Sequence, residues 1–137
     1  MLTPFHLAVP VRRLDECVAF YTEILGCAQG RSTDAWADLN FFGHQFVLHK
    51  AAKIQPLVHN SVDEKAVPVP HFGVILSYED FFNLVERLKA NAIEFIIEPY
   101  LRFEGQKGEQ ATMFFNDPDG NCIEIKAFKD FNAIFEH

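Results

Sequence analysis

The sequence predicts an α+β fold in which two paired βαβββ modules form a half-barrel cleft. The first observation is an internal repeat: FHLAV at residues 5–9 and PHFGV at residues 70–74 each place a valine three positions after a histidine. The second is that apolar residues at spacings of three and four follow each copy, as in an amphipathic helix. Strand-like runs come next, so each half reads as strand, helix and three further strands.

The first module is predicted to span about residues 1–50. Its helix begins near Asp15, which suits a first helical turn, and Gly26 is a suitable stop. Its strands are expected within residues 5–9, 31–42 and 44–50.

The second module is predicted to span about residues 70–128, and Asp80 begins its helix as Asp15 begins the first. The connection at residues 51–69 is rich in proline and has little periodicity, which predicts a linker. The tail at residues 129–137 is expected to form a short helix, and the whole chain, 1–137, is taken as one domain. The later strands of this module are expected at residues 93–99, 111–117 and 121–128.

The composition narrows the class of protein. A chain of 137 residues that is 49% hydrophobic can bury a core, and its 15 phenylalanines indicate an aromatic interior or pocket. The net charge of -7 disfavours nucleic acid as a partner, because an acidic surface repels phosphate. We find neither an apolar run that could span a bilayer nor an export signal at the N-terminus, and therefore expect no membrane partner and a cytoplasmic location.

Strand alternation directs three polar side chains away from the helices. His6 and His71 occupy matching repeat positions, and Glu124 alternates with the apolar Ile123 and Ile125. A lone strand histidine is more often a core or surface residue, but the matching positions favour one shared site. Two imidazoles and one carboxylate with open positions form the facial triad that binds iron(II), and zinc, manganese or nickel are alternatives.

The chain resembles the vicinal-oxygen-chelate superfamily, which includes glyoxalase I, extradiol dioxygenases, bleomycin-resistance proteins and fosfomycin-resistance transferases. FHLAVPVRRLDECVAFYTEILG is similar to the family's opening strand and helix, and MFFNDPDGNCIEI to its closing hairpin. The resemblance implies paired βαβββ modules and a metal held by His6, His71 and Glu124. Within the superfamily, the chain is most similar to small proteins described as extradiol-type dioxygenases.

The resemblance also allows branch-by-branch comparison. Glyoxalase I takes a fourth ligand from the last strand of the first module, where this chain has Val47, with Gln45 and His49 on the same face. Extradiol dioxygenases place an acid/base histidine on that strand, which suggests His49 as a catalytic residue. The same enzymes have a tyrosine where this chain has Phe114.

These observations predict a metal-dependent enzyme, specifically an extradiol-type dioxygenase that acts on a small substrate with vicinal oxygens. Phe46 and Phe114 are predicted to line the substrate wall, and Arg102 to hold a substrate carboxylate. The alternatives are a non-redox isomerase, lyase or transferase, and a resistance-type protein that only binds a small molecule. A homodimer is expected, because a free sheet edge invites association.

Overall fold

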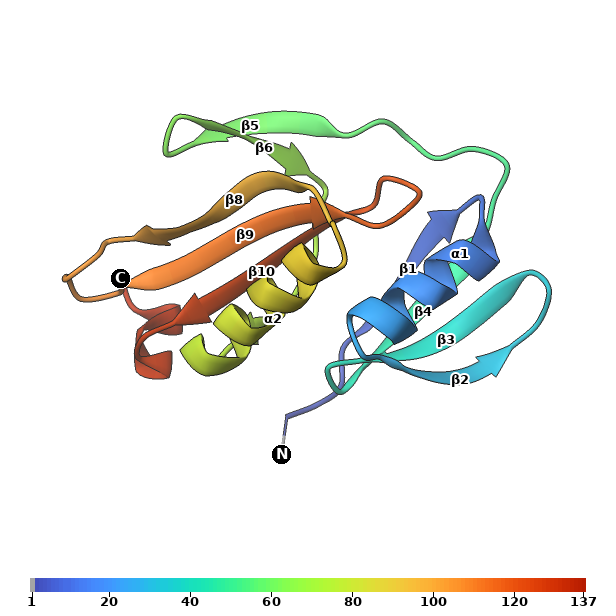
Figure 1. The fold of residues 1–137 in the computed structure, drawn as a ribbon, viewed down its shortest axis with the longest axis horizontal. Helices are drawn as coiled ribbons and strands as arrows, with labels where there is room; N and C mark the ends of the chain where they lie inside the picture. Colours follow the sequence, from blue (N-terminus) through green and yellow to red (C-terminus); the bar gives the residue numbers. More distant parts are fainter. Residues whose placement is uncertain (1) are drawn as a thin grey trace. The chain divides into compact units, whose positions relative to one another are not determined.

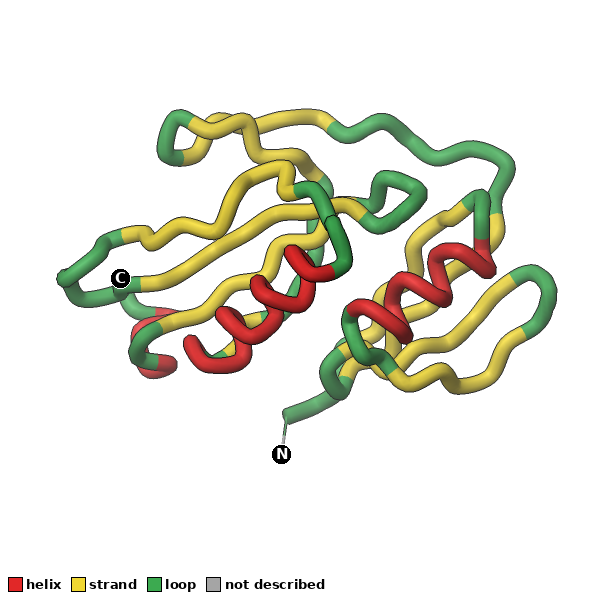
Figure 2. The backbone as a smooth tube through the Cα atoms, in the orientation of Figure 1, coloured by secondary structure: helices red, strands yellow, loops and turns green. Residues whose placement is uncertain are grey.

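The computed structural model describes residues 2–137 and confirms the α+β class with two βαβββ modules (Figure 1). The chain divides into two compact units. The first comprises the chain up to Pro56 together with Asp117–Asn121, and the second comprises Leu57–Asn116 together with Cys122–His137. Each unit has a four-stranded sheet with a helix packed on it, as Figure 2 shows by colour.

The first unit contains a sheet with the strand order β1-β4-β3-β2, in which β1 runs parallel to β4 and the other pairs are antiparallel. Helix α1 (Leu14–Ala19) packs on β3 and β4 and continues as one π-helical stretch, η1 (Phe20–Ile24). Gly26 follows with a φ of 77° and ends the helix as predicted. The strands are β1 (His6–Val11), β2 (Ala28–Ser32), β3 (Trp36–Phe41) and β4 (His44–Lys50).

Asp119 ties the turn at residues 117–121 to the start of α1 in this unit. Its carboxylate accepts hydrogen bonds from the backbone N–H groups of Arg12 and Arg13, both at 2.8 Å, and from Cys17 Sγ at 3.2 Å. The helix has no side-chain cap of its own, so Asp119 satisfies donors that a local capping residue would normally satisfy. The turn therefore belongs structurally to a helix about a hundred residues earlier in the chain.

The second unit contains a sheet with the strand order β7-β10-β9-β8, covered on one face by helix α2 (Tyr78–Ala90). Ser77 caps α2, because its hydroxyl accepts from the Asp80 N–H at 3.1 Å. The predicted apolar face of the helix, which includes Phe81 and Leu88, is buried. The strands are β7 (Ile75–Leu76), β8 (Phe95–Arg102), β9 (Gln110–Asn116) and β10 (Cys122–Phe128).

The segment at residues 51–69, predicted as a linker, contains regular secondary structure. It contains a β-hairpin formed by β5 (Val58–Val62) and β6 (Lys65–Val69). Asp63 and Glu64 form a two-residue turn with φ values of 51° and 62°, a geometry usually signalled by glycine or asparagine. The hairpin was missed because its turn lacks that signature and its strands carry mixed polar residues and a proline.

The tail contains the short helix that the sequence suggested. It is a single stretch of 3-10 helix, η2 (Phe131–Phe135), and Asp130 caps it by accepting from the Asn132 N–H at 2.9 Å. Within residues 2–137, none of the helices has the length and apolar character needed to cross a bilayer.

Gly73 allows the second module's opening segment to approach β10 closely. The Glu124 N–H donates to the Phe72 carbonyl at 2.8 Å, and the Lys126 N–H donates to the Val74 carbonyl at 3.0 Å. A Cβ atom added at Gly73 would lie 1.5 Å from the Glu124 carbonyl oxygen. Only glycine therefore fits between these two hydrogen bonds.

Replacing Gly73 by alanine is expected to destabilise the protein by about 1–3 kcal/mol, because the added methyl must push the segment off β10. Urea unfolding followed by circular dichroism measures the change. Gly30→Ala is the matched control, since a Cβ there would make only ordinary contact, at 3.4 Å from Asp38 Cβ. Equal stability of the two variants would contradict the close pairing described for residues 72–74.

The Asp119 interactions predict a stability that depends on acid pH. Burial opposes ionisation of Asp119, but the hydrogen bonds from Arg12, Arg13 and Cys17 outweigh it and lower the pKa from 3.8 to about 2. A lowered pKa in the folded state stabilises the fold above pH 3.8, and this contribution is lost as the pH falls toward 2.

Asp119→Asn should therefore be less stable than the wild type at neutral pH, and the difference should shrink between pH 3.8 and about 2. Urea unfolding at pH 7, 4 and 2 tests this. Asp34→Asn, which removes an exposed carboxylate from a loop of the same unit, controls for the change in net charge. A difference that stays constant with pH would show that the Asp119 charge does not act through these hydrogen bonds.

Candidate functional site

Strand β10 presents Glu124 on the sheet face opposite to helix α2. Its neighbours Ile123 and Ile125 are fully buried on the helix side, while the Glu124 side chain is 16% exposed. This is the alternation that the sequence predicted. His71 precedes the segment that pairs with β10, and Phe72 bridges to Ile123, so His71 arrives next to Glu124.

The side chains of His71 and Glu124 lie close together, and each has a second polar contact that fixes its direction. The distance from His71 Nε2 to Glu124 Oε2 is 3.0 Å. His71 Nδ1 lies 2.7 Å from the Pro68 carbonyl oxygen, an acceptor, so Nδ1 carries the proton and donates it. The Thr112 hydroxyl donates to the other carboxylate oxygen, Glu124 Oε1, at 2.7 Å. These contacts fix the direction of both side chains.

The pair lies beside a buried apolar cluster. Phe114 stands directly opposite Glu124 on β9, is only 4% exposed, and meets the His71 ring edge to face at a centroid distance of 5.1 Å. The β5–β6 hairpin covers this part of the sheet. The buried cluster comprises Val67 of the hairpin with Ile97, Phe114 and Cys122 of the sheet.

The geometry of the pair fits two ligands of one divalent cation. Nitrogen and oxygen donors bind such ions at about 2.0–2.2 Å, so two adjacent ligands lie about 3 Å apart, as His71 Nε2 and Glu124 Oε2 do. Metal-binding histidines characteristically donate their second ring N–H to a backbone carbonyl or carboxylate, as His71 does to Pro68. The same arrangement without an ion is an ordinary, partly buried ion pair, so the residues fit a metal but do not by themselves require one.

The third predicted ligand, His6, opens β1 in the first unit and is exposed. Within residues 2–137, no three His, Cys, Asp or Glu side chains gather closely enough to hold a metal ion. His71 and Glu124 are therefore the part of the triad that the structure brings together, and the role of His6 stays a prediction.

The strand registers identify the counterpart of Glu124 in the first module. Phe72 bridges to Ile123 in the second module, and its counterpart Leu7 is paired with Phe46 in the first. Val47 therefore takes the place of Glu124, and it is buried. The alignment that placed Val47 opposite Glu124 agrees with this register, so the first module has no carboxylate at this position.

The other residues predicted in the first module lie on different faces of β4. His49 is exposed and paired with Trp36 across the sheet, on the face away from α1, and its catalytic role stays a prediction. Phe46 packs against η1, the continuation of α1, with its ring centroid 4.9 Å from that of Tyr21 and 2% of its surface exposed. Its position alternates with Val47, so it belongs to the core and we leave it out of the proposed site.

Arg102 ends β8 and already contacts a carboxylate of the chain. Its Nε lies 2.6 Å from Oδ2 of Asp63 in the hairpin turn, and its guanidinium lies over the Phe103 ring at 5.1 Å. The Tyr100 hydroxyl donates to the same Asp63 oxygen at 3.0 Å. The contact with Asp63 is a close ion pair in which Arg102 Nε lacks good hydrogen-bond geometry, and the use of Arg102 for a substrate carboxylate stays a prediction.

Three contributors to this site were not found from the sequence. Thr112 and Tyr100 were detectable in part, because alternation places Thr112 on the face of Phe114, and a tyrosine in a strand often uses its hydroxyl. The Pro68 carbonyl had no sequence signal, since any residue supplies a carbonyl and only the backbone path directs it at His71.

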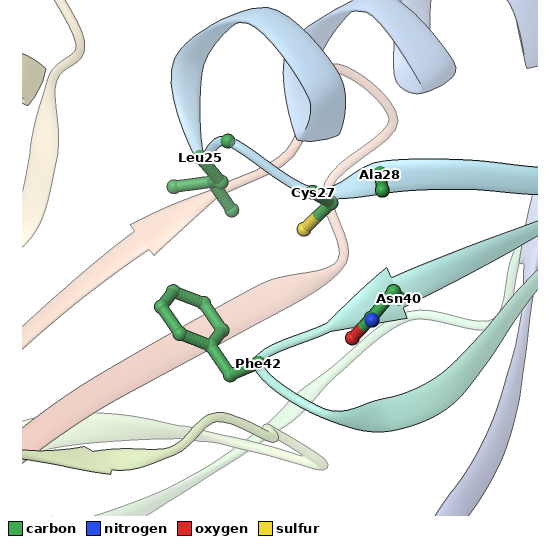
Figure 3. A pocket seen from close by; sticks show the side chains of 6 residues that line it. Leu25, Cys27, Ala28, Asn40 and Phe42 are labelled. Atoms are coloured by element: carbon green, nitrogen blue, oxygen red, sulfur yellow. The ribbon is translucent and has the colours of Figure 1, made fainter.

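A pocket in the first unit carries no comparable chemistry. It has a volume of about 220 Å³ and lies where Leu25 and Cys27 face Asn40 and Phe42 (Figure 3). Burial raises the pKa of Cys27 to about 11, so its thiol is protonated at neutral pH and is a poor nucleophile.

Comparison with known proteins agrees with the fold. The model of the Glyoxalase/Bleomycin resistance protein/Dioxygenase superfamily matches residues 3–125, and the chain belongs to this superfamily. A crystal structure of a glyoxalase/bleomycin resistance protein/dioxygenase from Alicyclobacillus acidocaldarius is 34% identical, with a TM-score of 0.78 over 97% of this chain and 96% of that one.

Two more distant structures share the fold. A fosfomycin resistance protein from Listeria monocytogenes is 20% identical, with a TM-score of 0.69 over 97% of this chain and 96% of that one. A lactoylglutathione lyase from Agrobacterium tumefaciens is 14% identical, with a TM-score of 0.66 over 100% and 98% of the two chains. At these identities the likeness concerns architecture, and the activities in their names belong to those proteins.

The Thr112–Glu124 hydrogen bond predicts a measurable cost when it is removed. Thr112→Val keeps the shape of the side chain but leaves Glu124 Oε1 without its donor, and Thr112 is only 2% exposed. The free energy of unfolding should fall by about 1–3 kcal/mol in urea titrations. Thr33→Val, at an exposed turn, should change it by less than about 0.5 kcal/mol, and similar values for both variants would contradict the described role of Thr112.

Proposed function

We propose that this chain is a divalent-metal enzyme acting on a small substrate that carries two neighbouring oxygen atoms. The observation that supports this most directly is the His71–Glu124 pair, with its donor atoms 3.0 Å apart and both side chains held by Pro68 and Thr112. His6, the repeat counterpart of His71, is the proposed third ligand. It is supplied by the same chain or by a second copy in a homodimer.

Iron(II) is the proposed metal, because two histidines and one carboxylate with open positions suit it, and zinc, manganese and nickel are the alternatives. When bound, a divalent ion supplies Lewis-acid stabilisation of substrate oxygens, and iron(II) adds chemistry with dioxygen. The protein's own contribution is to orient the ligands and to keep the site dry.

The residues around the pair perform these tasks. The Pro68 carbonyl keeps the proton of His71 on Nδ1, which leaves the Nε2 lone pair free to bind. Thr112 occupies Glu124 Oε1 and so directs Oε2 toward His71. Phe114 excludes water from one side of the pair by packing edge to face against the His71 ring. Its own ring is 4% exposed and leaves little surface for a substrate. His49 is the proposed acid/base residue.

Extradiol-type dioxygenation is the first proposed reaction, since the proposed ligand set of two histidines and a glutamate matches that branch of the superfamily. A non-redox reaction such as isomerisation, lysis or group transfer is the second candidate. Phe114 favours it, because ring-cleaving members have a tyrosine there, and a phenyl ring next to His71 can neither donate nor accept a proton.

Metal binding tests the proposal. Protein purified without oxygen should bind one divalent ion, and His71→Ala or Glu124→Gln should weaken its affinity by more than about 100-fold, since each removes a ligand. Isothermal titration with iron(II), zinc and manganese measures the affinity. His59→Ala is the matched control, because His59 is an exposed histidine on β5 of the same unit.

The same preparations distinguish the two reactions. Bound iron together with oxygen uptake on a panel of catechols supports the dioxygenase, whereas bound zinc or nickel without uptake supports the non-redox enzyme. If His71→Ala and the wild type bind every metal equally weakly, the metal site is wrong and a small-molecule binding protein becomes the better explanation.

A further inference from the structure

The β5–β6 hairpin brings an internal carboxylate to two side chains of the candidate site face. Asp63 lies in the hairpin turn, and its Oδ2 is 2.6 Å from Arg102 Nε and 3.0 Å from the Tyr100 hydroxyl. Both partners come from β8 and are two residues apart, so they share one face of the strand. A carboxylate is thus bound by a guanidinium and a phenol on a rigid sheet.

This arrangement lies close to the proposed ligands. Tyr100 is paired across the sheet with Thr112, and the Thr112 hydroxyl donates to Glu124. Strand β9 separates β8 from β10, and neighbouring strands are about 4.8 Å apart, so Tyr100 lies two strands away from Glu124 on the same sheet. The pKa of Tyr100 is also influenced by these neighbours. Burial and then the Asp63 carboxylate raise it, and Arg102 lowers it. Glu124 raises it by a smaller amount, so the Glu124 charge acts on the Tyr100 hydroxyl.

Asp63 is held less firmly than its partners. Its side chain is 42% exposed while that of Arg102 is 23% exposed, and it sits on a two-residue turn in the left-handed region. Ion pairs with this exposure contribute little to stability. Arg102, by contrast, is fixed on a sheet strand over the ring of Phe103. The Asp63 carboxylate is therefore the partner that can be displaced from Arg102 and Tyr100.

We infer that Arg102 and Tyr100 form a carboxylate-binding subsite and that Asp63 occupies it until a substrate carboxylate takes its place. The inference rests on the proposed function and specifies its substrate class: small vicinal-oxygen compounds that also carry a carboxylate. An arginine suits this role because its planar fork presents several donors to two carboxylate oxygens, whereas the pair with Asp63 engages one oxygen through Nε. The hairpin also supplies Pro68, so the element that contacts Arg102 is the one that orients His71.

Binding of two matched probes tests the inference. Protocatechuate is catechol with one added carboxylate, and isothermal titration compares the two ligands on the purified protein and again after metal removal with a chelator. The wild type should prefer protocatechuate, and Arg102→Gln should lose about tenfold or more of that affinity while catechol binding is unchanged. Asp63→Asn should raise the affinity for protocatechuate about twofold to fivefold, because the competing charge is gone.

Two variants control for the change in net charge: Arg31→Gln for the arginine and Asp34→Asn for the aspartate, both exposed in the first unit. Circular dichroism checks that each variant folds, and Asp63→Asn keeps the test valid if Arg102→Gln does not. The inference is overturned if Asp63→Asn leaves the protocatechuate affinity unchanged or lowers it, or if neither protein prefers protocatechuate to catechol. Such a result would leave the metal affinity and its dependence on His71 intact, so it is distinct from failure of the proposed function.

Discussion

The candidate site depends on the parallel pairing between residues 72–76 and β10. The bridge between Phe72 and Ile123 sets the register, and Gly73 allows the two backbones to approach until Glu124 N–H reaches the Phe72 carbonyl at 2.8 Å. His71 is the residue just before this contact. A shift of one position would turn Glu124 toward helix α2, where an unpaired carboxylate is costly. The backbone pairing thus determines which side chains meet.

The β5–β6 hairpin connects structure and chemistry in the second unit. Val67 covers the apolar part of the sheet, the Pro68 carbonyl orients His71, and Asp63 contacts Arg102. This hairpin, which lies between the two modules in the sequence, therefore shields the apolar cluster from water, sets the tautomer of His71 and contacts the Arg102 side chain.

The two modules share a plan but differ in chemical content. A histidine opens each module, His6 at the start of β1 and His71 just before the Phe72 bridge, and β1 and β7 both pair in parallel with the last strand of their own module. At the position where the second module has Glu124, the first has Val47. The two-histidine, one-carboxylate composition of the proposed ligand set thus follows from a repeat in which one copy keeps the carboxylate and the other does not. The superfamily assignment from residues 3–125 agrees with the shared plan, and Glu124 marks where the copies differ.

The sequence by itself determined the repeat, the order of helix and strands within each module, and the face on which Glu124 lies. These depend on periodicity, and a side chain's direction along a strand or helix is a local property of the backbone. Phe46 shows the limit of that information. It was predicted to line the substrate wall, but its side chain alternates with that of Val47 and packs against Tyr21 of η1. The tertiary structure decided what local patterns do not encode: the folding of residues 58–69 into a hairpin, the Asp63–Arg102 contact, and the use of the Pro68 carbonyl and the Thr112 hydroxyl as partners of the ligands. The physical reason is that these contacts join segments far apart in the chain through ordinary groups whose positions are fixed only when the strands pair and pack.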